Sequence, residues 1–150
     1  MKQDKIIPSL WFCTPNGNLT EVIDYYKTVF GEALQEGSII PLGKTPSGNA
    51  EMCEITIFSQ KYSVMSTEQE HHSFNDALSL SINCKDQDEI DKFWNYFTKD
   101  GEASQCGWCI DKYGVRWQVI PENLGELMQK PNAFDVMMRQ TKIVIDEYLQ

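Results

Sequence analysis

The sequence lacks any uninterrupted hydrophobic run of the ~18 residues that a membrane-spanning helix needs. Pro8 and Ser9 break the short apolar stretch at residues 6–12. We therefore expect no membrane segment and no export signal. Positive charge is also scarce, because 13 Lys and Arg stand against 22 Asp and Glu, for a net charge of −9. Such a chain repels phosphate backbones and anionic lipids, which disfavours nucleic-acid and membrane partners.

Disulfide pairing is not expected either. A chain of 150 residues buries roughly 69% of its unfolded surface, so it can fold as one domain without covalent staples. It has an odd number of cysteines, namely Cys13, Cys53, Cys84, Cys106 and Cys109. Reduced thiols fit this count, and we expect a cytoplasmic protein. Hydrophobic residues at 41% and charged residues at 23% are typical of an ordinary globular protein.

A repeated pattern organises the sequence. Residues 6–13 have strand composition, and Asn16-Gly17 supplies turn chemistry. Asn18, with Glu21 at the third helical position, predicts the start of a helix that Gly31 ends. The expected buried face consists of Leu19, Val22 or Ile23, Tyr26 and Phe30.

The same signals return further along the chain. Residues 77–84 form a predicted strand, Asp86 with Glu89 predicts a capping box, and Gly101 ends the helix. The helical stripe is Ile90, Phe93, Trp94 and Phe97. The two halves therefore look like copies of one unit.

Further strand-like segments complete each copy as a β-α-β-β-β module, with one strand of the second copy left open. They lie at residues 34–40, 51–58 and 62–67, and at 104–109 and 115–120. Residues 41–49 are rich in Gly, Pro and Ser, which predicts a loop, either a surface connection or a flap over a site. After Pro121 a helical stripe is expected, formed by Phe134, Met137, Met138, Thr141, Val144 or Ile145, and Tyr148.

Five segments resemble the PhnB-like family, often labelled a demethylubiquinone 3-methyltransferase domain, of the vicinal oxygen chelate superfamily. They are Pro8-Ser-Leu-Trp-Phe12 and residues 25–31, 74–77, 104–108 and 111–121. The superfamily includes glyoxalase I, bleomycin-resistance proteins and extradiol dioxygenases. The resemblance implies an α+β fold with two β-α-β-β-β modules in a curved, cleft-bearing sheet, plus C-terminal helices. It implies one domain over residues 1–150, with modules at 4–68 and 74–121 and a tail at 122–150.

The resemblance also implies where a metal would bind, because superfamily enzymes hold a divalent ion with side chains from the first and last strand of each module. The matching positions here are Ser9, Ser79, Val64 or Ser66, and Gln118. None is His, Asp or Glu, so we expect no metal. The chain also contains no Gly-x-Gly turn of the kind that typical S-adenosylmethionine sites use, and we expect no cofactor.

Strand alternation predicts which side chains line the cleft. Leu78, Leu80 and Ile82 should face the helix. The predicted lining consists of Ser9, Trp11, Glu54, Thr56, Ser79, Ser81, Asn83, Arg116 and Gln118. A polar lining with a tryptophan suits a small organic ligand. The alternative is a solvated or internally paired sheet face, for example with Glu54 bound to Arg116.

Individual residues suggest roles. Glu54 is the candidate general base, because partial burial can raise the pKa of a carboxyl group, and Arg116 could clamp a carboxylate or phosphate. Cys106 and Cys109 have the spacing of a redox or zinc half-site, but they lead into a strand rather than a helix, which favours a structural role. His71 and His72 read as a surface pair.

Several functions remain open at this point. The first is a metal-independent superfamily member that binds a small organic molecule, and the others are an enzyme of the family's nominal type or a drug-sequestering resistance protein. A scaffold that self-associates through its tail is a further alternative. Superfamily resemblance favours a homodimer in which the stripe from Phe134 to Tyr148 contacts a second chain, unless that helix packs on its own domain.

Overall fold

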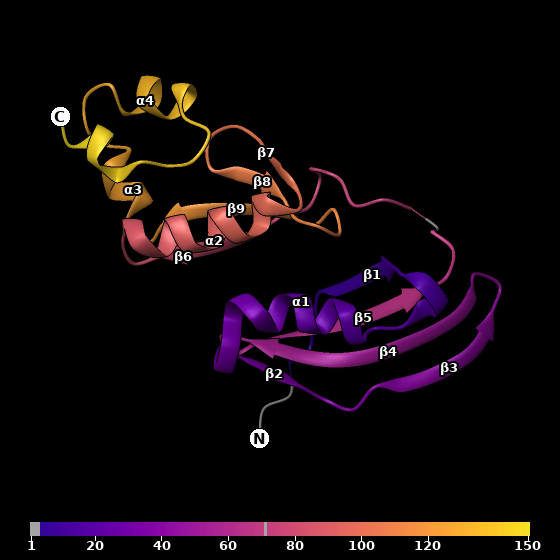
Figure 1. The fold of residues 1–150 in the computed structure, drawn as a ribbon. Coiled ribbons are helices and arrows are strands. Elements are labelled where there is room, and N and C mark those ends of the chain that lie inside the picture. Colours follow the sequence, from indigo (N-terminus) through magenta and orange to yellow (C-terminus); the bar gives the residue numbers. More distant parts are fainter. Residues whose placement is uncertain (1–3, 71) are drawn as a thin grey trace. The chain divides into compact units, whose positions relative to one another are not determined.

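The computed structural model describes residues 4–70 and 72–150 (Figure 1). The chain divides into two compact units, which we call unit 1 (Met1–His72) and unit 2 (Ser73–Gln150). Both units combine a mixed sheet with helices, so the predicted α+β class is confirmed. Within the described residues, no helix has the length and apolar character that a membrane span requires.

Unit 1 is built on a five-stranded sheet whose main order is β1-β5-β4-β2, with β3 also pairing with β4. Strand β1 runs parallel to β5, and the other pairs are antiparallel. The elements in chain order are β1 (Ser9–Cys13), η1 (Pro15–Gly17), α1 (Thr20–Phe30), η2 (Gly31–Ala33), β2 (Leu34–Glu36), β3 (Ile40–Thr45), β4 (Gly48–Ile57) and β5 (Gln60–Thr67).

Helix α1 covers one face of this sheet (Figure 1). Alternation along β1 buries Leu10 and Phe12, and the Phe12 ring lies 6.2 Å from the ring of Tyr26 on α1. The predicted helix face is confirmed, because Val22, Ile23, Tyr26 and Phe30 are all buried. Gly31 ends the helix at φ 57, as predicted, in a backbone conformation that glycine adopts without a steric penalty.

The predicted cap of α1 by Asn18 is wrong. The helix begins one residue later, at Thr20, with Leu19 at the N-cap position and no side-chain bond from that residue. Instead, the backbone N of Leu19 donates to Oε1 of Glu51 on β4, at 2.8 Å. A carboxylate from the sheet therefore supplies what the sequence pattern assigned to a local residue.

The loop predicted at residues 41–49 is also wrong. Strand β3 occupies Ile40–Thr45, and β4 already begins at Gly48, so the two form a hairpin with a register shift between Pro41 and Gly43. The run of Gly, Pro and Ser concealed this strand because such residues are rare within strands. Edge strands and bulges, however, tolerate both Pro and Gly. Unit 1 thus contains one strand more than the predicted module.

Unit 2 repeats the arrangement with a four-stranded sheet in the order β6-β9-β8-β7. Strand β6 is parallel to β9, and the remaining pairs are antiparallel. The elements are β6 (Leu80–Cys84), α2 (Gln87–Lys99), β7 (Glu102–Ala103), β8 (Trp108–Ile110), β9 (Arg116–Pro121), α3 (Leu124–Leu127), α4 (Ala133–Arg139) and η3 (Ile145–Tyr148). The strand left open by the sequence is β7.

The start of α2 confirms the capping prediction. Asp86 is the N-cap residue, and its Oδ1 accepts a hydrogen bond from the backbone N of Glu89 at 2.9 Å. The Glu89 side chain reaches back to the backbone N of Lys85 at 3.2 Å. The predicted stripe of Ile90, Phe93, Trp94 and Phe97 is buried, and the Phe97 ring stacks on Trp117 of β9 at 4.5 Å.

The long helical stripe predicted for the tail is wrong. Helix α4 ends at Arg139, and Gln140 adopts an extended backbone because its carbonyl, and that of Thr141, accept bonds from Cys106 and Gly107. The tail buries Ala133, Val136, Gln140, Ile143 and Tyr148. Phe134 and Met138 of the predicted stripe are instead 65% and 48% exposed. The tail therefore packs within unit 2, and of the residues assigned to a dimer contact only Tyr148 is among those buried.

Candidate functional site

Each sheet has one face covered by the helix of its own unit and one face opposite that helix, which we call the open face. On the open face of unit 1, an apolar row crosses the strands. Trp11 on β1 is in register with Met65 on β5, and Met65 with Met52 on β4. Ile40 on β3 continues the row. The Trp11 side chain is 38% exposed. Neither methionine was predicted from the sequence: alternation from Glu54 and Thr56 along β4 points to Met52, but Met65 depends on the pairing register of β5.

The Trp11 ring is fixed in place by its own polar edge. Its Nε1 donates to Oγ1 of Thr67 at 2.8 Å, and that hydroxyl donates to the backbone O of Gln69 at 2.7 Å. Thr67 is buried. A partly exposed tryptophan whose N–H is already bonded presents its apolar surface rather than its donor.

A polar row runs beside the apolar one. Ser9 is in register with Ser63, and Ser63 with Glu54. Glu54 is 61% exposed at its side chain, and its Oε2 lies 3.9 Å from Nζ of Lys61. The predicted general base therefore lacks the burial on which that role was argued. Thr56, the other predicted β4 residue, is half-buried and in register with Lys61.

The metal-ligand position that the resemblance implies on the last strand of the first module, Val64 or Ser66, needs correction. Val64 and Ser66 are both buried on the face of β5 that α1 covers, and Oγ of Ser66 lies 2.6 Å from Oγ1 of Thr14. The residue that shares the open face with Ser9 is Ser63. The expected position was therefore shifted by one residue along β5, which places it on the opposite face of the sheet. The sequence alone does not fix the pairing register between β1 and β5.

The open face of unit 2 carries Ser81 and Asn83 on β6, both exposed, while Ile82 and Cys84 are buried on the other side. Gln118 on β9 is in register with Ser81 and with Trp108 on β8. Trp108 was not assigned to the lining from the sequence. Leu78 precedes β6 and is 63% exposed, so the expectation that it packs under the helix is wrong.

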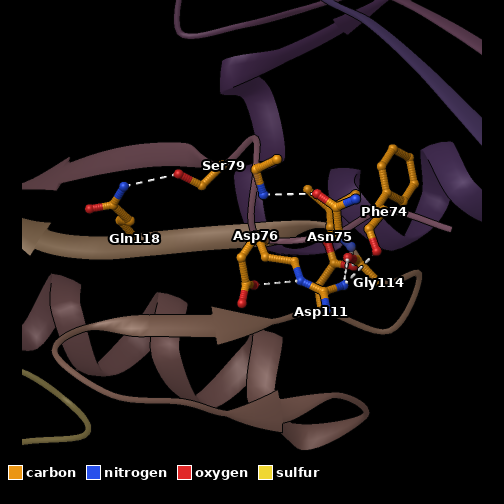
Figure 2. Close-up of polar contacts among 10 residues, drawn as sticks. Phe74, Asn75, Asp76, Ser79, Asp111, Gly114 and Gln118 are labelled. Atoms are coloured by element: carbon orange, nitrogen blue, oxygen red, sulfur yellow. Dashed lines mark hydrogen bonds and ion pairs between the residues drawn. The ribbon is translucent and has the colours of Figure 1, made fainter.

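Arg116 is bound within unit 2, to Asp76 and to the carbonyls of Phe74 and Gly114, which Figure 2 labels. Its Nε donates to Oδ1 of Asp76 at 2.9 Å, and its Nη1 donates to the carbonyls of Phe74 and Gly114 at 3.0 and 2.8 Å. The side chain is only 20% exposed. With Nε and Nη1 occupied, a bidentate clamp on a ligand anion would have to break these bonds. Arg116 therefore fastens the segment around Phe74 to β9.

Two further polar contacts shape this region. Nε2 of Gln118 donates to Oγ of Ser79 at 2.9 Å (Figure 2). Buried Asp111 accepts from the backbone N atoms of Tyr113 and Val115, and its Oδ2 accepts from Nε1 of Trp117 at 2.9 Å. This turn sets the Gly114 carbonyl that Arg116 binds. Asp111 was missed as a structural residue, although Asp before a Gly-containing turn is a known signal for such bonds.

The cysteines are free thiols, and two of them are strongly suppressed as nucleophiles. Burial raises the pKa of Cys84 and of Cys109 to about 12. A thiol that stays protonated is a poor nucleophile and a poor metal ligand, which supports the structural interpretation of Cys109. His71 lies outside the described residues, and His72 is exposed. Across residues 4–70 and 72–150, no group of three or more His, Cys, Asp or Glu is placed to hold a metal ion.

Comparison with known proteins agrees with this architecture. The PhnB protein from Bacillus cereus is 24% identical, with a TM-score of 0.63 over 79% of this chain and 98% of that chain. A protein from Pseudomonas aeruginosa is 20% identical, with a TM-score of 0.57 over 79% and 97%. The fosfomycin resistance protein FosX from Listeria monocytogenes, complexed with Mn(II) and sulfate ion, is 9% identical, with a TM-score of 0.52 over 78% and 90%.

These neighbours have the glyoxalase/bleomycin-resistance fold, which confirms the predicted architecture. No curated protein sequence matches the chain. The family model described as 3-demethylubiquinone-9 3-methyltransferase matches residues 4–120, most of both units. The chain therefore belongs to this PhnB-like family of the vicinal oxygen chelate superfamily.

Proposed function

We propose that this protein binds a small organic molecule on the open faces of its sheets, without a metal ion. The observation that carries the proposal is the row of Trp11, Met65 and Met52, which lies in register on the face that α1 leaves uncovered. Tryptophan and methionine offer large, polarizable surfaces, and small-molecule sites are mostly apolar with a few polar groups. The row suits a ligand with a flat or extended apolar body.

Polar groups on each open face would orient a ligand bound to that face. On unit 1 they are Ser9 and Ser63, and on unit 2 they are Ser81, Asn83 and Gln118. Hydroxyl and amide groups donate and accept hydrogen bonds without carrying charge. Ser79 and Arg116 support the arrangement by holding Gln118 and the segment around Phe74.

A metal of the kind present in the FosX complex does not suit this donor set. The corresponding positions hold Ser9, Ser63, Ser79 and Gln118, which are neutral oxygen donors, and Ser79 is already bound to Gln118. Zn, Fe and Mn sites use imidazole, thiolate or carboxylate ligands. Elemental analysis of the purified protein tests this point. A stoichiometric metal that is lost with Gln118→Ala would contradict it.

Ligand binding is tested by a thermal-shift screen of metabolites and drugs, followed by titration calorimetry with each hit. A ligand at a hundred times its dissociation constant adds ~2.7 kcal/mol of stability. We expect Trp11→Leu and Met65→Ser to weaken the binding of a hit about tenfold or more, because each removes buried contact area worth roughly 1.5 kcal/mol. Phe134→Ser, which removes an exposed aromatic side chain from α4, is the matched control.

The control should bind every hit as the parent chain does. Binding that survives both changes on the open face, or that is lost equally in the control, would contradict the assignment. A hit that is bound but not converted favours a sequestering protein of the resistance type. Turnover that Glu54→Gln abolishes while affinity is kept would instead give Glu54 the role of general base.

The family description makes a methyltransferase the second candidate. Its cofactor would be S-adenosylmethionine, but the chain has no Gly-x-Gly turn of the type with which open parallel sheets bind it. We expect calorimetry to show no binding. Micromolar binding that the demethylated cofactor competes would establish the methyltransferase. A homodimer also stays a prediction, although the predicted tail stripe no longer supports it.

A further inference from the structure

The segment of residues 140–145 is held at several points along its backbone. After α4 ends, the carbonyl of Gln140 accepts from the backbone N of Cys106 at 2.9 Å, and that of Thr141 accepts from Gly107 at 2.7 Å. These two acceptors pair successive N–H groups of the turn between β7 and β8. The segment therefore acts on that turn as a short neighbouring strand would.

Gln87, the first residue of α2, fastens the same segment through its side-chain amide. Its Nε2 donates to the carbonyl of Ile143 at 2.9 Å, and its Oε1 accepts from the backbone N of Ile145 at 2.8 Å. In a parallel sheet, one residue donates to the carbonyl of one neighbour and accepts from the N–H of the residue two positions further on. The Gln87 side chain makes the same two bonds, to Ile143 and Ile145. The amide thus satisfies two backbone groups that no regular element serves.

A second contact from α2 supports this attachment. Nε2 of Gln87 also donates to Oδ1 of Asp91 at 3.0 Å, and Lys142 in the segment forms an ion pair with the same oxygen at 2.9 Å. The bond from Gln87 and the adjacent Lys142 hold the pKa of the Asp91 carboxyl below its ordinary value. Asp91 and Lys142 are both partly exposed, so this pair is a minor contribution beside the amide bonds.

The side chain of Ile143 transmits the attachment to the turn. Ile143 is fully buried, and a Cβ added to Gly107 would lie only 2.9 Å from its Cγ1. Gly107 also has φ +84, where a side chain would be strained. The turn therefore carries a glycine at the point where Ile143 packs against it.

The turn at residues 105–108 determines where β8 begins. Trp108 N donates to the carbonyl of Gln105 at 3.0 Å, and Val119 N donates to that of Gly107 at 2.8 Å. Trp108 is the next residue, in register with Gln118 on the open face of unit 2. We infer that Gln87 is a positioning residue, which fastens residues 140–145 and thereby sets the turn at 105–108 and the place of Trp108.

The test is amide hydrogen exchange by NMR on the full chain. In Gln87→Leu the carbonyl of Ile143 and the N–H of Ile145 lose their partners, and a buried unpaired group costs roughly 1–3 kcal/mol. We expect the exchange of Cys106 and Gly107 to accelerate about tenfold or more through local opening, and the indole N–H resonance of Trp108 to shift. Gln87→Glu keeps the acceptor alone and should give a smaller acceleration.

Two internal references make the result decisive. The amide of Phe93, within α2, should keep its rate, and Gln129→Leu, which replaces an exposed glutamine of unit 2, should change nothing. Unchanged exchange at Cys106 and Gly107 would overturn the inference. Equal acceleration at Phe93 would also overturn it, because that pattern reports general destabilisation. If Gln87→Leu does not fold, Gln87→Glu carries the same comparison. These readouts need no ligand, so they stand apart from the proposed binding function.

Discussion

The N-terminus of α1 offers a sharp test of how this fold is held together. The backbone N–H of Leu19, which has no partner within the helix, donates to Oε1 of Glu51 at 2.8 Å, and the two residues are 32 positions apart in the sequence. Sequence reasoning places the cap on Asn18. We therefore expect Glu51→Ala to destabilise the protein clearly and Asn18→Ala to change its free energy of unfolding very little.

The expected magnitude comes from two contributions. Removing a side-chain cap costs about 1 kcal/mol, and losing a carboxylate near the positive end of the helix dipole costs about 0.3–1 kcal/mol more. Glu51→Ala should therefore lower the free energy of unfolding by about 1.5 kcal/mol, or the melting temperature by roughly 3–6 °C for a chain of this size. Glu51→Gln keeps the acceptor and loses only the charge, so about half of the loss is expected.

Urea unfolding followed by circular dichroism measures these differences. Glu54→Ala is a matched control, because Glu54 lies on the same strand but on the opposite face, exposed and 3.9 Å from Lys61. An exposed pair of this kind is worth about 0–1 kcal/mol, so the control should fall near the parent. A larger loss from Asn18→Ala than from Glu51→Ala would refute capping from the sheet. Equal losses from Glu51→Ala and Glu54→Ala would refute it as well.

Two other properties are open to measurement. Phe58 and Ser59 in the turn between β4 and β5 have φ values of 47 and 71, which residues with a side chain rarely adopt. Ser59→Gly should therefore raise the free energy of unfolding by about 0.5–1 kcal/mol, which urea unfolding measures as a higher midpoint. Burial raises the pKa of the Cys84 and Cys109 thiols from 9.0 to about 12, so the folded state retains protons that the unfolded chain releases. The contribution of these two thiols to stability should be constant below about pH 9 and should fall as the pH rises above it. A smaller fall above pH 9 in Cys109→Ala supports this cause, and an equal fall contradicts it.

The contrast between the two helix starts shows which features a sequence can predict. Asp86 and Glu89 form a cap from residues within one turn of chain, and the structure confirms it at 2.9 Å. The cap of α1 comes from Glu51, on a strand whose register no local pattern specifies. Local bonds and the period of strands and helices were therefore predictable, whereas bonds that depend on tertiary pairing were not.

The same distinction explains the misplaced elements. Ile40–Thr45 carries Pro and Gly, which local propensity assigns to loops, yet pairing with β4 makes it a strand. In the tail, the helical stripe ignored the acceptors that Cys106 and Gly107 require, and those bonds end the helix at Arg139. In both segments, hydrogen bonds to another segment of the same unit override the local preference, to the next strand for β3 and to a distant turn for the tail.

The charged and the apolar side chains of the open faces differ in their contacts. Sequence reasoning assigned Glu54 and Arg116 to chemistry. Each lies beside an opposite charge of its own unit, Glu54 at 3.9 Å from Lys61 and Arg116 at 2.9 Å from Asp76. Nη1 of Arg116 also donates to two backbone carbonyls, so this residue anchors the backbone rather than binding an anion. Of these two charges, Arg116 is thus committed to structure. In the proposed function, recognition would depend on the apolar surface of Trp11 and Met65 and on neutral hydroxyl and amide groups, which favours a ligand selected by shape over one selected by charge.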